Sequence, residues 1–141
     1  MQIREITSLD ERTLEEVKRL MLQLGGENGF DEASLRELIS SPYSHIYAAS
    51  EDNSRILGLA SLCIYHAPSG KIASIEDVIV DEPARGKHIG KALMERILEE
   101  AHREAPIKLK LTSRPSRIAA NKLYSSLGFS LRETNPYELT I

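Results

Sequence analysis

The chain has 141 residues, of which 41% are hydrophobic and 28% are charged, with a formal net charge of -3 at pH 7. This length and composition fit a single globular domain over residues 1–141, and the acidic balance argues against a nucleic-acid partner. No apolar run approaches the about 20 residues of a membrane span, and the amino terminus lacks the apolar core of a signal peptide. With only one cysteine, no intramolecular disulfide is possible, so we expect a cytoplasmic protein.

Hydrophobic spacing and turn residues predict the elements of the first half of the chain. A strand over residues 3–6 comes first. Two helices follow: one begins at the capping-box spacing of Ser8 and Glu11 and ends at Gly25 and Gly26, and the other begins at Asp31 as its cap and ends before Pro42. Strands are then predicted over residues 46–49, 55–65 and 71–80. Turns at residues 51–54 and 67–70 separate the strands. These three strands should therefore meander with antiparallel pairing.

The second half predicts a strand–helix–strand unit. The helix spans about residues 88–104, and the alternating stretch 107–111 indicates a half-buried strand, parallel to residues 71–80. A further helix begins near Pro115 and stops at Gly128, and strands over residues 129–131 and 137–141 would finish the sheet. We thus expect an α/β fold, with a mixed, mostly antiparallel twisted sheet of six or seven strands and four helices.

A basic segment opens the helix that follows strand 71–80. It contains Arg85, Lys87, His88 and Lys91, and no acidic residue lies between Glu82 and Glu95. Cations in a first helical turn oppose the helix macrodipole, whose positive end already lies there. A bound anion such as a phosphate group is the simplest reason for this placement, and the glycines nearby let the backbone approach it. The alternative is an ordinary helix start with solvated surface cations.

Two other phosphate-binding motifs are excluded. The stretch Gly86–Ala92 is one residue short between its glycines for a P-loop, and Ala92 replaces the Ser or Thr that ligates magnesium. A dinucleotide fingerprint is excluded because its glycine triplet and its ribose-binding acid are missing. We expect no metal site, because no metal-ligand spacing relates the residues His45, His66, His102 and Cys63.

Residues 85–90, Arg-Gly-Lys-His-Ile-Gly, resemble the acyl-CoA-binding motif of the GNAT family of N-acetyltransferases, Arg/Gln-x-x-Gly-x-Gly/Ala. Residues 119–129 are similar to that family's second signature, a helix ending in Leu-Tyr-x-x-x-Gly-Phe, and the order of elements agrees over nearly the whole chain. The resemblance implies that the central parallel pair splays, with acetyl-CoA in the opening and its pantetheine arm paired with the backbone of Val78, Ile79 and Val80. The pyrophosphate would lie on the amides of Arg85, Gly86, Lys87, His88, Ile89, Gly90 and Lys91.

Two positions depart from the family pattern. His88 stands where the family usually has its first glycine, so that a side chain either contacts a phosphate or points to solvent. Arg117 occupies the place where many members have an Asn that bonds the pantetheine arm. The expected pantetheine contact is therefore Asn121, one helical turn later.

The resemblance also implies a role for Tyr124 as the donor of a proton to the leaving CoA thiolate. From spacing alone, a tyrosine on the apolar stripe of its helix is equally well explained as a core residue. General acid catalysis of this kind contributes roughly 10² to 10⁴-fold to a rate.

Glu76 and Asp77 interrupt the apolar strand 72–80. Strict alternation puts Glu76 with Val78 on one face and Asp77 with Ile79 on the other. Burial raises the pKa of a carboxyl and can tune it as a base. We favour Glu76 as the base that receives the amine proton. Asp77, a water chain and a purely electrostatic role remain as alternatives.

Together these features predict an N-acetyltransferase that moves the acetyl group of acetyl-CoA to a primary amine by direct attack. The acceptor would be a small molecule or a peptide, without nucleic acid or membrane, and a homodimer is left open. The alternative from another class is a non-catalytic acyl-CoA sensor of the same fold, and a third is a nucleotide-phosphate binder.

Overall fold

A computed structural model of the protein describes residues 1–52 and 55–141. Its contacts divide the chain into two compact units, Met1–Leu111 and Thr112–Ile141. The predicted turn at residues 51–54 ends in two residues, Asn53 and Ser54, that lie outside the described residues.

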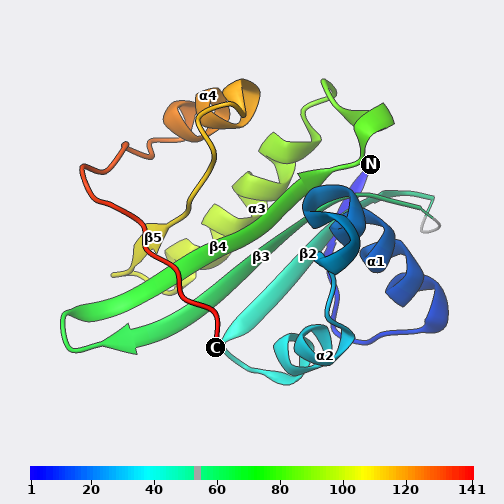
Figure 1. Ribbon diagram of the computed structural model, residues 1–141, viewed down its shortest axis with the longest axis horizontal. Helices are drawn as coiled ribbons and strands as arrows, with labels where there is room; N and C mark the ends of the chain where they lie inside the picture. Colours follow the sequence, from blue (N-terminus) through cyan, green and yellow to red (C-terminus); the bar gives the residue numbers. More distant parts are fainter. Residues whose placement is uncertain (53–54) are drawn as a thin grey trace. The chain divides into compact units, whose positions relative to one another are not determined.

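The elements follow one another along the chain much as the sequence predicts (Figure 1). The first unit holds β1 (Gln2–Glu5), α1 (Glu11–Gly25), the short 3₁₀ helix η1 (Gly26–Asn28), α2 (Glu32–Ser40), β2 (Ser44–Glu51), β3 (Arg55–Ala67), β4 (Gly70–Val80), the 3₁₀ helix η2 (Glu82–Ala84), α3 (Ile89–Arg103) and β5 (Lys108–Lys110). The second unit holds α4 (Ile118–Ser126).

A sheet with the strand order β1-β2-β3-β4-β5 forms the frame of the first unit. Neighbouring strands pair antiparallel as far as β4, whereas β4 and β5 pair parallel, with α3 as their crossover connection. The predicted meander and the predicted parallel pair are both confirmed. In Figure 1, α3 lies on one face of the sheet and α1 and α2 lie on the other.

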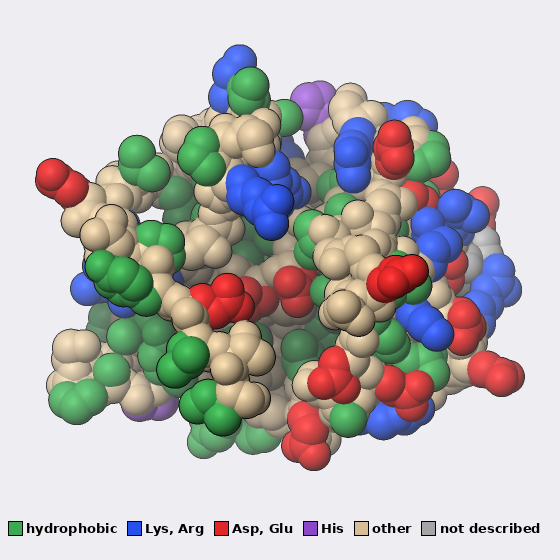
Figure 2. All heavy atoms as spheres, in the orientation of Figure 1, with side chains coloured by type: hydrophobic (Ala, Val, Ile, Leu, Met, Phe, Trp, Pro, Cys, Tyr) green, Lys and Arg blue, Asp and Glu red, His purple; other side chains and the backbone are tan. Residues whose placement is uncertain are grey.

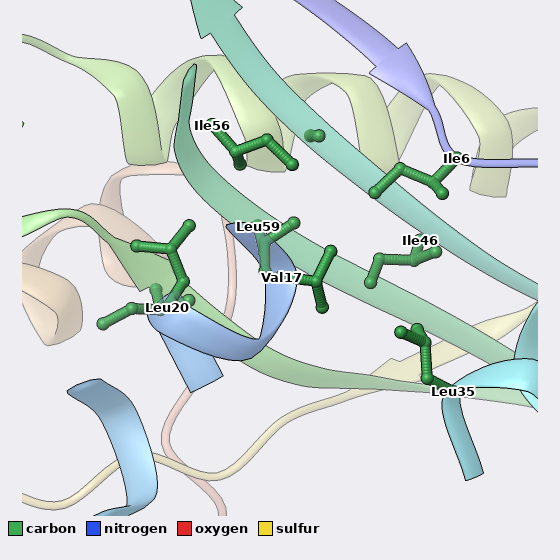
Figure 3. Packing of buried hydrophobic residues seen from close by; sticks show 9 residues of the cluster. Ile6, Val17, Leu20, Leu35, Ile46, Ile56 and Leu59 are labelled. Carbon is green, nitrogen blue, oxygen red and sulfur yellow. The ribbon is translucent and has the colours of Figure 1, made fainter. Parts of the chain in front are cut away.

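Apolar side chains of α1 and α2 fill the space against one face of the sheet. Val17 and Leu20 of α1 and Leu35 of α2 are buried, and they pack with Ile46 of β2 and Leu59 of β3 (Figure 3). The apolar spacing along the sequence thus corresponds to a core beneath both helices. The outer surface is mixed: over α1, at the right of Figure 2, basic and acidic side chains are interspersed.

Both helices on this face begin at an aspartate. Asp31 caps α2 as predicted, with its carboxylate 3.3 Å from the Ser34 amide. The prediction of a capping box beginning at Ser8 is wrong, because Asp10 caps α1 and accepts from the Thr13 amide at 2.7 Å. A carboxylate at this place bonds a free amide and also complements the positive end of the helix.

Close contact between α3 and the sheet depends on Gly58 in β3. A β-carbon at this position would lie 2.9 Å from Cδ1 of Leu93 and 3.1 Å from Cγ2 of Ile89. Leu93 and Ile89 are both buried residues of α3. Because Gly58 has no side chain, the first turns of α3 can pack closely against β3, the strand next to β4.

The second unit agrees with the prediction at one point and differs at two. Its helix α4 begins at Ile118 rather than near Pro115, whereas the predicted stop at Gly128 is confirmed, since Gly128 follows the C-cap with a left-handed φ of 97°. Residues 129–141 contain no strand in the described chain, so the described sheet has five strands and the expected six or seven is wrong. Leu131 and Tyr137 are 100% and 89% exposed. Alternation makes a stretch suitable for a strand, but a strand also needs a hydrogen-bonded neighbour, which local sequence does not specify.

Candidate active site

The parallel strands β4 and β5 pair over only part of β4. The paired residues are Ile72–Ser74 of β4 and Lys108–Lys110 of β5, after which β4 continues to Val80. The Asp81 amide donates to Leu57 of β3 at 2.8 Å, so the carbonyl of Val80, one residue earlier, points away from β3 to the side of β5. This edge of β4 therefore has the position at which an extended ligand could add to the sheet.

A β-bulge interrupts β4 beside this edge. Leu59 of β3 faces Ile79, and Ser61 faces Glu76, so that one residue of β3 opposes two residues of β4, Asp77 and Val78. Asp77 has a φ of 53°, in the left-handed region. Residues in sparsely populated backbone conformations cost about 1–3 kcal/mol and cluster at functional sites.

The bulge corrects the faces that strict alternation assigned. Leu59 and Ser61 lie on the same face of β3, so their partners Ile79 and Glu76 also share a face, that of α1 and α2. Sequence alternation had placed these two residues on opposite faces. The extra residue in β4 shifts the alternation by one position, and this shift is the physical reason for the error.

Two carboxylates meet at the bulge. The Ser74 hydroxyl donates to Oε1 of Glu76, which orients that carboxylate. Burial, and then the negative charge of Glu76, raise the pKa of Asp77 above its usual value. Although both residues keep exposed surface, the site therefore holds one oriented carboxylate and a neighbour whose charged form is disfavoured. This pair can attract an ammonium group and accept its proton.

The loop between β4 and α3 carries the basic segment. After η2, the backbone takes left-handed values of φ at Gly86 (80°) and His88 (63°), and α3 begins at Ile89. His88 is the N-cap residue, its side chain makes no capping hydrogen bond, and the first turn of α3 contains no acidic residue. Alternating backbone twist of this kind turns successive amides toward one side, as in anion-binding loops. The first amides of α3 are thus available to an anion.

The cationic side chains of this loop and of the first turn of α3 are on the surface. Arg85, Lys87, His88 and Lys91 are all exposed. Lys91 is 3.9 Å from Glu95, with both side chains more than half exposed, so this pair stabilises the helix little. The predicted cofactor-binding residues of the loop therefore lie together around the start of α3.

Sequence reasoning missed a network that joins α1 to this loop. Asp81, directly after β4, is 2% exposed, and its carboxylate accepts hydrogen bonds from Arg19 at 2.9 Å, Gln23 at 3.1 Å and Arg55 at 3.3 Å. Burial works against the charged form of Asp81, but the hydrogen bonds from Gln23 and Arg19 and the charge of Arg19 outweigh it and lower the pKa. The sequence signal was an acid that ends an apolar strand, together with Arg19 and Gln23 four residues apart on one helix.

Tyr124 and Asn121 lie on α4, in the second unit. Tyr124 is 6% exposed and its ring packs edge-on against Phe129, with the ring centroids 6.2 Å apart. Burial raises the pKa of its phenol. The Asn121 amide nitrogen donates to the carbonyl oxygens of Arg117 at 2.8 Å and Arg114 at 3.0 Å. The structure thus gives Asn121 a local role in the turn that leads into α4, which the sequence did not suggest.

Metal-ligating side chains do not gather in threes anywhere within residues 1–52 and 55–141. Over the same residues, no helix has the length and apolar character that crossing a membrane requires.

The mixed sheet with one parallel pair, the bulge in β4 and the basic start of α3 define a class of α/β protein with a candidate site for an anionic ligand. Comparison with known proteins identifies the family. The model of the acetyltransferase (GNAT) family matches residues 6–129, and the chain belongs to this family. No match was found among curated proteins.

Solved structures of similar fold cover nearly the whole chain. An acetyltransferase from Trypanosoma brucei is 25% identical with a TM-score of 0.77, over 99% of both chains. An aminoglycoside acetyltransferase from an uncultured soil metagenomic sample is 17% identical with a TM-score of 0.84, over 99% of this chain and 95% of that one. The aminoglycoside N-acetyltransferase AAC(6')-Iy, solved in complex with CoA, is 19% identical with a TM-score of 0.78, over 99% of both chains.

Proposed function

We propose that the protein transfers the acetyl group of acetyl-CoA directly to a primary amine. The observation that carries this proposal is the start of α3, where the left-handed Gly86 and His88 precede a first turn without an acidic residue and with exposed cations around it. A pyrophosphate fits this cradle, because its charge would complement both the free amides and the side chains of Arg85, Lys87 and Lys91. The pantetheine arm would extend along β4 at Val78–Val80.

In the proposed reaction the neutral amine attacks the thioester carbonyl carbon, and the carbon–sulfur bond breaks. An alkyl ammonium has a pKa near 10.4, so it must first lose a proton. We assign this proton to Glu76, directly or through water, with Asp77 beside it to favour a cationic acceptor. Tyr124 gives its proton to the leaving thiolate and is reprotonated, directly or through water, by the second proton that the nitrogen loses as the amide forms. Asn121 contacts the pantetheine arm. Holding both reactants together would supply much of the acceleration.

For the acceptor, the proposal extends to the class of primary amines, in a small molecule or a peptide. The two acidic side chains at the β4 bulge favour a positively charged one. Two of the similar structures are aminoglycoside acetyltransferases, which supports a small polycationic acceptor as one member of this class.

The test is release of free CoA thiol from acetyl-CoA in the presence of a panel of amines: a polyamine, an aminoglycoside and a lysine peptide. We expect turnover with at least one of them, and loss of turnover when the same amine is supplied already acetylated. Tight CoA binding by calorimetry without turnover on a broad panel would instead support the acyl-CoA sensor. Absence of CoA binding would refute both.

A further inference from the structure

Gln23, on the last turn of α1, connects this helix to the loop that follows β4. Its carboxamide makes hydrogen bonds at both ends: Nε2 donates to Oδ1 of Asp81 at 3.1 Å, and Oε1 accepts from the backbone amide of Glu82 at 2.9 Å. Asp81 and Glu82 are the first two residues after β4. The loop between β4 and α3, residues 81–88, is called the cofactor loop below because it carries the proposed pyrophosphate site. One side chain of α1 therefore fixes two consecutive residues where this loop leaves the sheet.

The same carboxamide also reaches further into the loop. Oε1 of Gln23 lies 3.5 Å from Nη2 of Arg85, whose Nε donates to the carbonyl of Val80 at 3.1 Å. Arg85 is the first residue of the segment that resembles the acyl-CoA motif. Gln23 thus contacts the loop at its beginning and at the arginine that precedes Gly86.

The partner of Gln23 is itself held rigidly. Asp81 has a side chain that is 3% exposed, and it is bonded by Arg19 of α1 and Arg55 of β3. Arg19 also donates to the carbonyl of Ile56 at 2.9 Å. A buried carboxylate with several donors stays in one place, because losing any of them leaves a charge unsatisfied.

We infer that Gln23 is a positioning residue for the cofactor loop, which it anchors to α1 through Asp81, the Glu82 amide and Arg85. This inference rests on the proposed function, since the loop is the proposed pyrophosphate site. Its physical basis is preorganisation: a loop that is already ordered loses less conformational entropy when the ligand binds. The residue itself does not touch the cofactor.

The test uses Gln23→Met, which keeps the length of the side chain and removes both hydrogen-bonding groups. Because Gln23→Met removes one donor from the buried Asp81 carboxylate, the melting temperature should fall by a few degrees while the variant still folds, and CoA binding is measured well below it. We expect the CoA dissociation constant and the KM for acetyl-CoA to rise about tenfold, the size expected for the loss of one to two hydrogen bonds. The kcat at saturating acetyl-CoA and the KM for the acceptor should stay within about twofold. Gln2→Met, at an exposed glutamine of β1, is the matched control and should change none of these values.

A second measurement separates this inference from the proposed function. Hydrogen exchange of the Glu82 amide, measured without any cofactor, should accelerate roughly tenfold in Gln23→Met and remain unchanged in Gln2→Met. If the wild-type protein failed to bind CoA, the proposed function would be refuted. The exchange rate of the Glu82 amide would still decide whether Gln23 orders the loop. Unchanged exchange at Glu82 would overturn the inference, and so would wild-type CoA affinity in Gln23→Met.

A double-mutant cycle tests the step through Arg85. If Gln23 acts partly through the guanidinium, then Gln23→Met should raise the CoA dissociation constant less in an Arg85→Met background than in the wild type. We expect the effect to fall from about tenfold to about threefold. Fully additive effects would contradict the contribution of Arg85.

Discussion

Arg85 donates a hydrogen bond from Nε to the carbonyl oxygen of Val80, 3.1 Å away, and so closes the cofactor loop onto the strand that leads into it. That carbonyl points to the side of β5, and the parallel register of β4 with β5 covers Ile72–Ser74 of β4. The last carbonyl of the proposed pantetheine edge therefore already accepts one hydrogen bond from the loop. Because a carbonyl oxygen has two lone pairs, a pantetheine amide that pairs with Val80 would share this acceptor with Arg85, whereas one that pairs earlier on the strand would not.

Lys91→Glu should separate cofactor binding from folding. The substitution reverses a charge beside the proposed pyrophosphate, so we expect CoA affinity to fall tenfold or more, since two charges about 4 Å apart in water interact by about 1 kcal/mol and reversal counts this twice. It also puts an acid into the first turn of α3, where the helix dipole favours it, so the melting temperature should be equal or higher. Calorimetry and thermal unfolding measure the two effects.

The control for this charge reversal is Lys18→Glu, at an exposed position of α1. It changes the net charge equally but lies outside the cofactor loop, so CoA affinity should remain close to wild type at 0.15 M salt. Unaltered CoA affinity in Lys91→Glu, with only a higher melting temperature, would contradict the phosphate assignment for the start of α3.

Tyr124→Phe should lower turnover tenfold or more while CoA affinity is retained. The phenol would be the proton donor to the leaving thiolate, and phenylalanine keeps the ring contact with Phe129. Because burial raises the pKa of Tyr124, the donor form persists to a higher pH than in an ordinary tyrosine, and the alkaline loss of wild-type turnover from this group should be shifted upward accordingly. A pH–rate profile and single-turnover kinetics check both statements. Unchanged turnover in the variant would refute the general-acid role.

Asp77→Asn should stabilise the fold and change catalysis. Burial and Glu76 raise the pKa of Asp77 in the folded protein. The protonated carboxyl therefore adds to the free energy of unfolding at pH values below the pKa that Asp77 has in the unfolded chain. This contribution is lost as the pH rises through the pKa that Asp77 has in the folded protein. At pH 7 the charged form of Asp77 therefore destabilises the folded protein, and the neutral amide of asparagine removes this effect. Asparagine also tolerates the φ of 53° at this position. Urea denaturation at pH 7 should show a higher midpoint, and the difference from wild type should vanish near pH 3.

The companion variant is Glu76→Gln. It removes the charge that raises the pKa of Asp77, so the pKa of that carboxyl, followed by NMR, should fall toward its usual value. If Glu76 is the base, Glu76→Gln should also cost roughly 10²-fold or more in kcat/KM, and Asp77→Asn should cost less. The reverse order of these two losses would assign the base to Asp77.

The bulge at Asp77 shows where prediction from this sequence stops. Apolar periodicity gave the helices, the antiparallel meander and the parallel pair, because each is a repeating local pattern that burial enforces. One extra residue in β4 then reversed the faces of every later position. Its residue type is a weak mark, because aspartate adopts left-handed φ more readily than most residues but is common in other conformations as well. Gln23 and Asp81, 58 residues apart, show the same limit, since long-range polar pairs have no period.

His88 supplies the last prediction, because the structure explains why a glycine is usual at its position in the family. Its φ of 63° is left-handed, a conformation that costs a residue with a β-carbon roughly 1–2 kcal/mol and costs glycine nothing. His88→Gly should therefore raise the melting temperature slightly, since the relief of strain exceeds the about 0.4–1 kcal/mol that glycine loses through the unfolded chain. CoA affinity should be equal or tighter, because the backbone can approach the pyrophosphate more closely.

His88→Ala separates the backbone from the imidazole, since alanine keeps the strained conformation and removes the ring. The imidazole is exposed at the N-cap and makes no capping hydrogen bond, so His88→Ala should bind CoA within about twofold of wild type. A tenfold loss in both variants would show that the imidazole contacts a phosphate. A loss in His88→Gly alone would instead mean that CoA binding depends on the stiffness that a β-carbon gives this turn.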